Sequence, residues 1–220
     1  VEASDVNGDG VKDVIATSGY LVYALDGLTG EAFWSFEADD NLWRVSVTSD
    51  LTGDGSPDLA IGGQNGYMHV LNGRDGDLLW EKRITQKYEA KDDRGNSWKE
   101  MDRSAWDIVP VRVRDAPMAV VSSEDGSVRL INLQDGSEDW KVQVIDYVNA
   151  LLDRYYQRKK GQASSPGDFH FFNLRVFPIG DVSGDGTEEI LVSAHLGREA
   201  EQGQEPRGAG LLVLDVATGS

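Results

Sequence analysis

Three loops in the sequence carry oxygen-bearing side chains at alternating positions. The first runs Asp5-Val6-Asn7-Gly8-Asp9-Gly10-Val11-Lys12-Asp13, and its pattern recurs from Asp50 and from Asp181. Such side chains on a tightly curved loop converge on one point, and a glycine at position six permits the sharp turn. Oxygen-only ligands at uneven geometry suit calcium better than magnesium. With the carbonyl oxygen of position seven included, the predicted ligands are Asp5, Asn7, Asp9, Val11 and Asp13; Asp50, Thr52, Asp54, Ser56 and Asp58; and Asp181, Ser183, Asp185, Thr187 and Glu189.

The sequence therefore predicts up to three calcium ions, against two alternatives. A helix-flanked loop of the EF-hand kind needs a bidentate Glu at position twelve, where Ala16, Ile61 and Val192 stand, so that alternative fails. The other alternative is a plain Asp-Gly turn, in which the side chains bond the backbone. Three copies with acids at the same offsets favour the metal. The corresponding stretch of the third repeat, 111–115, has no alternating ligands, and no ion is expected there.

The loops belong to a longer repeat, since 45 residues separate Asp5 from Asp50. Each unit contains short segments rich in Val, Ile, Leu and Tyr, bounded by Gly and Asp turns, which is the pattern of β-strands. An intervening segment, 43–48 in the first unit, makes four strands per unit. A period of this length with four strands is typical of a β-propeller blade, because one small sheet buries its faces only against its neighbours. A β-sandwich with chance similarity is the weaker alternative.

Three tryptophans, Trp34, Trp80 and Trp140, each follow a turn glycine by four residues. They could form a platform for a carbohydrate or a quinone. Their fixed place in every unit instead favours a structural role, in which each indole wedges between adjacent sheets and donates its N–H to the backbone of the neighbouring blade.

These motifs resemble two known families. The segment from Tyr23 to Trp34, Tyr23-Ala24-Leu25-Asp26-Gly27-Leu28-Thr29-Gly30-Glu31-Ala32-Phe33-Trp34, resembles the tryptophan-docking repeat of the quinoprotein-like (PQQ-like) propellers, and the first acidic loop resembles the calcium loop of the integrin-type FG-GAP propellers. Both families include enzymes, adhesins and assembly factors, so the resemblance implies a fold more than an activity. Fewer than four complete units are present. We expect a piece of a larger ring, the alternative being a ring completed by another chain.

The predicted architecture is thus a single all-β domain over residues 1–220, a partial propeller of about four four-stranded blades. Insertions are expected at 86–103, 145–170 and 196–209. The first reads as a long charged loop and the third as a mobile, glycine- and Glu-rich loop. Residues 145–160 have helical apolar spacing, with Gly161 as the stop, and predict one amphipathic helix that packs on its own propeller or on a partner.

The net charge of −17 disfavours nucleic acid as a partner, because such a surface repels phosphate backbones. The chain has no cysteine, which excludes disulfides and thiolate chemistry. No apolar run approaches the roughly 18 residues of a spanning helix. The opening residues also lack the basic and apolar regions of a signal peptide.

Catalytic motifs are sparse, and no catalytic or cofactor-binding residue is predicted. The histidines His69, His170 and His195 are scattered. Asp107 and the region around His170 are candidate contributors to a catalytic site, but no motif assigns a role to either. The first hypothesis is a calcium-binding, non-enzymatic propeller that contacts a protein partner or its own copies through its inserted loops and helix. Filled calcium loops suggest an extracellular, cell-surface or periplasmic location. The second hypothesis is an enzyme on a quinoprotein-like or polysaccharide-acting propeller.

Overall fold

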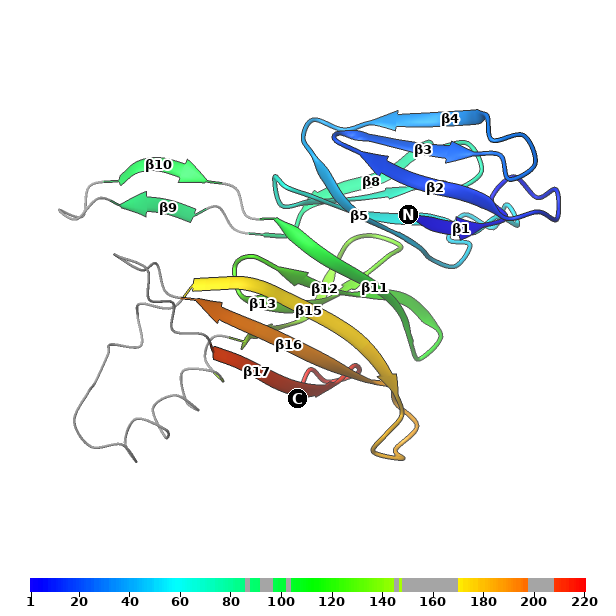
Figure 1. Cartoon of the computed structure of the whole chain (residues 1–220). Helices are drawn as coiled ribbons and strands as arrows, with labels where there is room; N and C mark the ends of the chain where they lie inside the picture. The colour runs from blue at the N-terminus through cyan, green and yellow to red at the C-terminus, as the bar shows by residue number, and fades with distance from the viewer. Residues whose placement is uncertain (86–87, 92–96, 102–103, 145–146, 148–169, 198–207) are drawn as a thin grey trace, which may run out of the picture.

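The computed structural model describes residues 1–85, 88–91, 97–101, 104–144, 147, 170–197 and 208–220. Their regular structure is antiparallel β-sheet, in which strands consecutive in sequence pair as hairpins (Figure 1). This confirms the all-β prediction. Among these residues no helix is long and apolar enough to cross a membrane.

The four blade-like sheets follow one another along the chain. The first contains β1 (Glu2–Ser4), β2 (Asp13–Ser18), β3 (Leu21–Leu25) and β4 (Ala32–Glu37); the second, β5 (Leu42–Val47), β6 (Leu59–Gly63), β7 (Tyr67–Leu71) and β8 (Leu78–Arg83); the third, β11 (Ala105–Val113), β12 (Ala116–Ser123), β13 (Ser127–Asn132) and β14 (Glu138–Gln143); the fourth, β15 (His170–Gly180), β16 (Glu189–Gly197) and β17 (Gly208–Asp215).

The acidic loops join the first and second strands of a sheet, which fixes where each repeat begins. The segment 43–48, expected to complete the first unit, instead starts the second sheet, because β5 pairs with β6 in the register Val45↔Ile61. In the third sheet a tight turn replaces the acidic loop. Its central residues Arg114 and Asp115 have φ angles of 49° and 67°, as a two-residue hairpin requires.

The prediction that 86–103 is a long loop is wrong for much of its length. Strands β9 (Tyr88–Lys91) and β10 (Ser97–Met101) form a two-stranded antiparallel sheet, which stands apart from the four blades in Figure 1. Pairing the two segments satisfies backbone N–H and C=O groups that a loop would leave to water.

The other two insertions are shorter than expected. His170 belongs to β15, Leu196 and Gly197 extend β16, and Gly208 and Ala209 begin β17 opposite them. Apart from Tyr147, the predicted helix at 145–160 lies outside the described residues, as does the centre of the third insertion, 198–207.

The apolar core lies between the sheets rather than within any one of them. Val22 and Ile61 belong to a cluster between the first and second sheets, Met68 and Val121 to one between the second and third, and Leu130 and Val192 to one between the third and fourth. The central strands are accordingly buried, and every residue of β6 is buried. Each sheet is stabilised by its neighbours, as blade stacking requires.

The first strands of neighbouring sheets lie side by side, β1 against β5, β5 against β11 and β11 against β15. Three of these strands contain β-bulges, between Leu42 and Arg44, between Ala105 and Ile108, and between Phe171 and Asn173. Bulges redirect side chains and bend the strand. This row of first strands carries the pocket described below.

Candidate functional site

The first residue of each acidic loop accepts hydrogen bonds from the loop's own backbone. Asp5 accepts the N–H groups of Gly8 and Gly10, at 2.7 and 2.9 Å. Asp50 and Asp181 do the same with the glycines at the matching positions, Gly53 and Gly55, and Gly184 and Gly186. These N–H groups lower the pKa of Asp50, with Gly55 contributing most.

The ninth residue of each loop is buried and ties the loop together. Asp13 accepts the N–H groups of Val6 and Gly27, and Asp58 those of Leu51 and Gly73, so both acids also hold the turn after the third strand. Glu189 accepts the N–H groups of Val182 and Ser183 within its own loop. Burial raises the pKa of Asp58 despite its two N–H partners.

The middle positions make local bonds as well. Their acids Asp9, Asp54 and Asp185 accept the N–H of position seven, from Val11, Ser56 and Thr187. At position three, the Asn7 amide donates to Asp13 and the Thr52 hydroxyl to Asp50, while Ser183 accepts the N–H of Asp185.

The structure therefore contains the side-chain-to-backbone bonds of the plain-turn alternative. They do not use up the ligand capacity of the loops, because a carboxylate has about four lone-pair sites. In Asp181, for example, Oδ1 accepts two N–H groups and Oδ2 accepts one. In the third loop, carboxylate oxygens of Asp181, Asp185 and Glu189 all lie within 4.8 Å of one another. Calcium at any of the three loops stays a prediction.

The predicted docking of the tryptophans is confirmed. The Nε1–H groups of Trp34, Trp80 and Trp140 donate to the carbonyl oxygens of Gly73, Leu133 and Val216, at 3.0, 2.8 and 2.8 Å. Each acceptor follows the third strand of the next sheet, and the indole lies over that sheet's turn glycine. These residues join the blades and are not available as a platform for a ligand.

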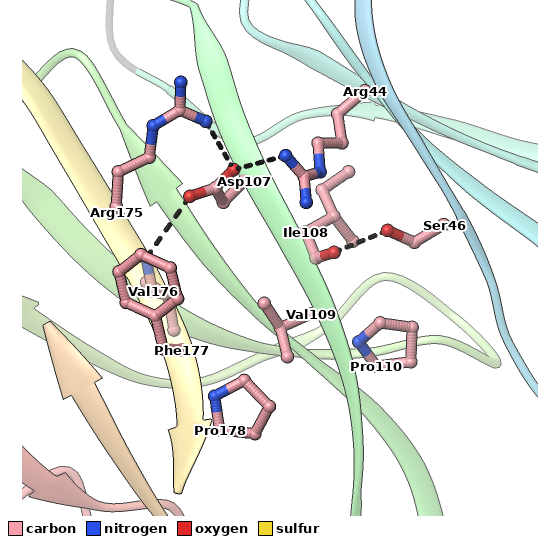
Figure 2. A pocket seen from close by; sticks show the side chains of 10 residues that line it. All are labelled: Arg44, Ser46, Asp107, Ile108, Val109, Pro110, Arg175, Val176, Phe177 and Pro178. Carbon is pink, nitrogen blue, oxygen red and sulfur yellow. Dashed lines mark hydrogen bonds and ion pairs between the residues drawn. The ribbon is translucent and has the colours of Figure 1, made fainter. Parts of the chain in front are cut away.

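A pocket of about 540 Å³ opens along the first strands of the second, third and fourth sheets (Figure 2). Asp107 of β11 lies at its centre, with a side chain only 5% exposed. Arg44 of β5 and Arg175 of β15 approach it from the two sides, each through Nη1, at 3.4 and 2.9 Å from Oδ1. The rest of the lining is mostly apolar: Ser46, Ile108, Val109, Pro110, Val176, Phe177 and Pro178.

The three charged residues occupy equivalent positions in three successive blades. Each one directly precedes the first-strand residue that pairs with the second strand in the registers Val45↔Ile61, Ile108↔Val121 and Val176↔Val192. The blade stacking therefore brings Arg44, Asp107 and Arg175 together, although the sequence separates them widely.

Hydrogen bonds fix the carboxylate of Asp107 in this place. Its Oδ2 accepts the N–H of Val176, and its own N–H donates to the Ser122 hydroxyl, both at 3.2 Å. That hydroxyl donates in turn to the carbonyl oxygen of Leu174. On the other side, the Ser46 hydroxyl donates to the carbonyl oxygen of Ile108. The pocket wall is thus held by bonds between neighbouring blades.

The sequence offers Asp107 as a candidate without a motif, and it does not predict Arg44 or Arg175 as site residues. The usable signal is a repeat aligned on its first strands, which places Trp43-Arg44-Val45 over Trp106-Asp107-Ile108 and Leu174-Arg175-Val176. A charged residue in front of a buried apolar one is the unusual feature of that alignment. This alignment becomes visible only when each repeat is taken to begin at the first strand of its sheet, that is, at β5, β11 and β15.

Stacked antiparallel sheets joined by docked tryptophans define a β-propeller of the PQQ-like repeat class. The chain belongs to the family described as outer membrane protein assembly factor BamB, which matches residues 18–152. It is 28% identical over 154 residues to the outer membrane protein assembly factor BamB of Yersinia pestis, a match that covers 67% of this chain and 35% of the relative. The chain therefore spans about a third of the length of that curated relative.

Two solved structures share the fold. BamB from Moraxella catarrhalis superposes with a TM-score of 0.52 at 14% identity, over 100% of this chain and 50% of that one. BBS1N, crystallised in complex with ARL6DN, gives a TM-score of 0.55 at 12% identity, over 98% of this chain and 57% of that one. At such identities these likenesses establish the fold alone.

Proposed function

We propose that this chain is part of a protein-binding scaffold of the cell envelope, which acts in outer membrane protein assembly. The observation that supports it is the family match over 18–152, since the relative is named for that role. This proposal narrows the expected location to the periplasmic side of the outer membrane.

The inserted hairpin is the proposed contact with the partner. Blade residues are committed to stacking, whereas β9 and β10 belong to no blade and stand apart from the four sheets in Figure 1. Segments that the scaffold does not need are where recognition is usually found. We include residues 145–169, which also interrupt the repeat, in this proposal on the basis of sequence alone.

The test uses the full-length protein in its source cell. Deleting the gene should lower the amount of folded protein in the outer membrane fraction, and the unaltered gene should restore it. A version with 86–103 replaced by a short Gly/Ser linker should accumulate normally but fail to restore it. Trp43→Ala, at an exposed blade position, serves as the matched control and should restore it. An unchanged outer membrane in the deletion strain would contradict the proposal.

We further propose that the acidic loops bind calcium, as their likeness to FG-GAP loops suggests. Carboxylate oxygens of Asp181, Asp185 and Glu189 lie within 4.8 Å of one another, which supports this proposal. An ion bound there would have a structural role at the edge of the blades. The alternative hypothesis of a quinoprotein-like enzyme is tested separately, by a cofactor screen on the full-length protein.

A further inference from the structure

We infer that the pocket between Arg44 and Arg175 binds an acidic side chain of a protein partner, flanked by apolar residues. The inference rests on the proposed function for the kind of ligand and on the geometry of the pocket for its chemistry. It assigns a ligand to a site that the family match does not describe.

The charge of the pocket favours an anion. Two guanidinium groups face one buried carboxylate, so the pocket has a net charge of about +1 within a chain whose net charge is −17. Arg44 and Arg175 are 51% and 42% exposed, and each contacts Asp107 through only one of its nitrogens. A guanidinium has five N–H donors in a planar fork that suits a carboxylate. The two arginines can therefore hold Asp107 and a second carboxylate at once.

The buried Asp107 favours a carboxylate over a phosphate as that anion. A dianionic phosphate would lie close to the fixed negative charge of Asp107 and would exceed the single positive charge available. A monoanionic carboxylate matches that charge. Arginine pairs well with both anions, so the buried acid between the two arginines makes the distinction.

The apolar wall of the pocket favours a peptide over a free small acid. Val109, Pro110, Phe177 and Pro178 continue the pocket along β11 and β15, away from the arginines (Figure 2). A free small acid would leave this apolar wall exposed to water, whereas a peptide with apolar residues next to its acidic residue would cover it. The charged end lies near the start of β11, six residues after β10 ends at Met101. A partner held by the hairpin is thus close to the pocket.

The experiment follows the side-chain Nε–Hε signals of Arg44 and Arg175 by NMR in ¹⁵N-labelled full-length protein. The probe is acetyl-Phe-Glu-Phe-amide, and its neutral twin is acetyl-Phe-Gln-Phe-amide. The glutamate peptide should shift both signals, with at least tenfold weaker binding of the twin, as expected for loss of one charge-assisted pair. Equal shifts from both peptides, or none from either, would overturn the inference.

Variants separate this result from a general charge effect. Arg44→Gln should weaken binding of the glutamate peptide by roughly tenfold, whereas Arg112→Gln, an exposed arginine outside the pocket, should leave it unchanged. Asp107→Asn should strengthen binding, because it removes the competing charge and keeps an oxygen for the Val176 N–H. If Arg44→Gln does not fold, Arg44→Lys keeps the charge without the fork and should still weaken binding.

Competition identifies the source of the anion. Propionate or inorganic phosphate that displaces the peptide at or below the peptide's own concentration would overturn the assignment to a peptide side chain. The glutamate peptide could fail to bind while the 86–103 replacement still fails to restore the outer membrane. That result would reject the pocket as a binding site and leave the proposed function standing. The reverse result would reject the function and keep the pocket.

Discussion

At the scale of single residues, the turn glycine beneath each docked indole is tightly constrained. A Cβ added at Gly76, where φ is +80°, would lie 2.7 Å from Cε3 of Trp34. Gly30 has the same place in the first sheet and a φ of +74°, but no described atom lies within 4 Å of its added Cβ.

Gly76→Ala should therefore destabilise the protein more than Gly30→Ala. Both substitutions impose left-handed backbone strain of about 1–2 kcal/mol. Gly76→Ala must also displace the indole, an overpacking cost of about 1–3 kcal/mol. Urea unfolding measures the two losses. Equal decreases in the free energy of unfolding would mean that the indole moves aside at little cost and that its contact with Gly76 is not tightly packed.

Asp125 predicts a defined pH dependence of stability. Burial opposes its ionisation, but the Arg129 guanidinium and the Ser123 and Ser127 hydroxyls outweigh burial, and the pKa of Asp125 lies well below its ordinary value. Its stabilisation is then fully present above the unfolded pKa of about 3.9 and is lost as the pH falls below that value towards the folded pKa.

Asp125→Asn should lower the free energy of unfolding at pH 7 and flatten its decline in acid. Unfolding by urea between pH 7 and about pH 2.5 measures both effects, with exposed Asp139→Asn as the control that should change neither. Parallel stability curves for wild type and Asp125→Asn would show that the ion pair with Arg129 contributes nothing.

At the scale of elements, the fourth strand of each of the first three sheets carries the link to the next blade. Trp80 on β8 donates to the carbonyl oxygen of Leu133 beyond β13 and lies over Gly136 of the same turn. This bond crosses from the second sheet to the third, and the same arrangement recurs for Trp34 and Trp140.

Trp80→Ala should destabilise the protein by less than the roughly 3–5 kcal/mol that truncating a fully buried indole costs, because Trp80 is only partly buried. Trp80→Phe should retain part of the packing but lose about 1 kcal/mol for the missing hydrogen bond. Trp43, 54% exposed on β5, is the matched control, and Trp43→Ala should change stability by less than about 0.5 kcal/mol. Thermal and urea unfolding compare the three. Similar losses from Trp80→Ala and Trp43→Ala would contradict the docking role.

Elements that repeat could be predicted from the sequence, and those that do not repeat could not. The segments around Val22, Ile61 and Val192 stand at fixed distances from a loop or a turn glycine, so local pattern identified them as strands. Strands β9 and β10 lie in a charged segment without a repeat partner, and tertiary context decides their pairing. The pocket was missed for another reason. Arg44, Asp107 and Arg175 share a place only once the phase of the repeat is known.

At the scale of the whole molecule, the topology gathers negative charge on one rim. The loops after β1 and β5 carry three acids each and the loop after β15 carries four, and all three follow first strands that lie side by side, at the right in Figure 1. The hairpin of β9 and β10 lies at the opposite end of the stack, at the left. The fold thus separates an acidic rim from the proposed partner surface. Repulsion along that rim opposes folding unless cations or salt offset it.

Calcium bound in the loops of this rim should stabilise the folded protein. An ion that binds only the folded protein stabilises it by about 2.7 kcal/mol at a concentration of 100 times its Kd. Thermal unfolding in 1 mM calcium should therefore give a higher Tm than unfolding in excess chelator, and the same concentration of magnesium should restore little of the difference, because magnesium demands a stricter geometry.

Asp9→Ala assigns part of that effect to the first loop. In calcium the variant should have a lower Tm than wild type, because it has lost a ligand of the ion. In chelator the two proteins should have similar Tm values, because neither binds the ion. Asp135→Ala, in a turn of the third sheet that has no acidic loop, removes one carboxylate away from the predicted ligands and should leave the calcium effect intact. Equal melting of wild type in calcium and in chelator would reject the metal. The acids of these loops would then have only the structural role of the plain-turn alternative, in which Asp5, Asp50 and Asp181 accept the N–H groups of their own loop glycines.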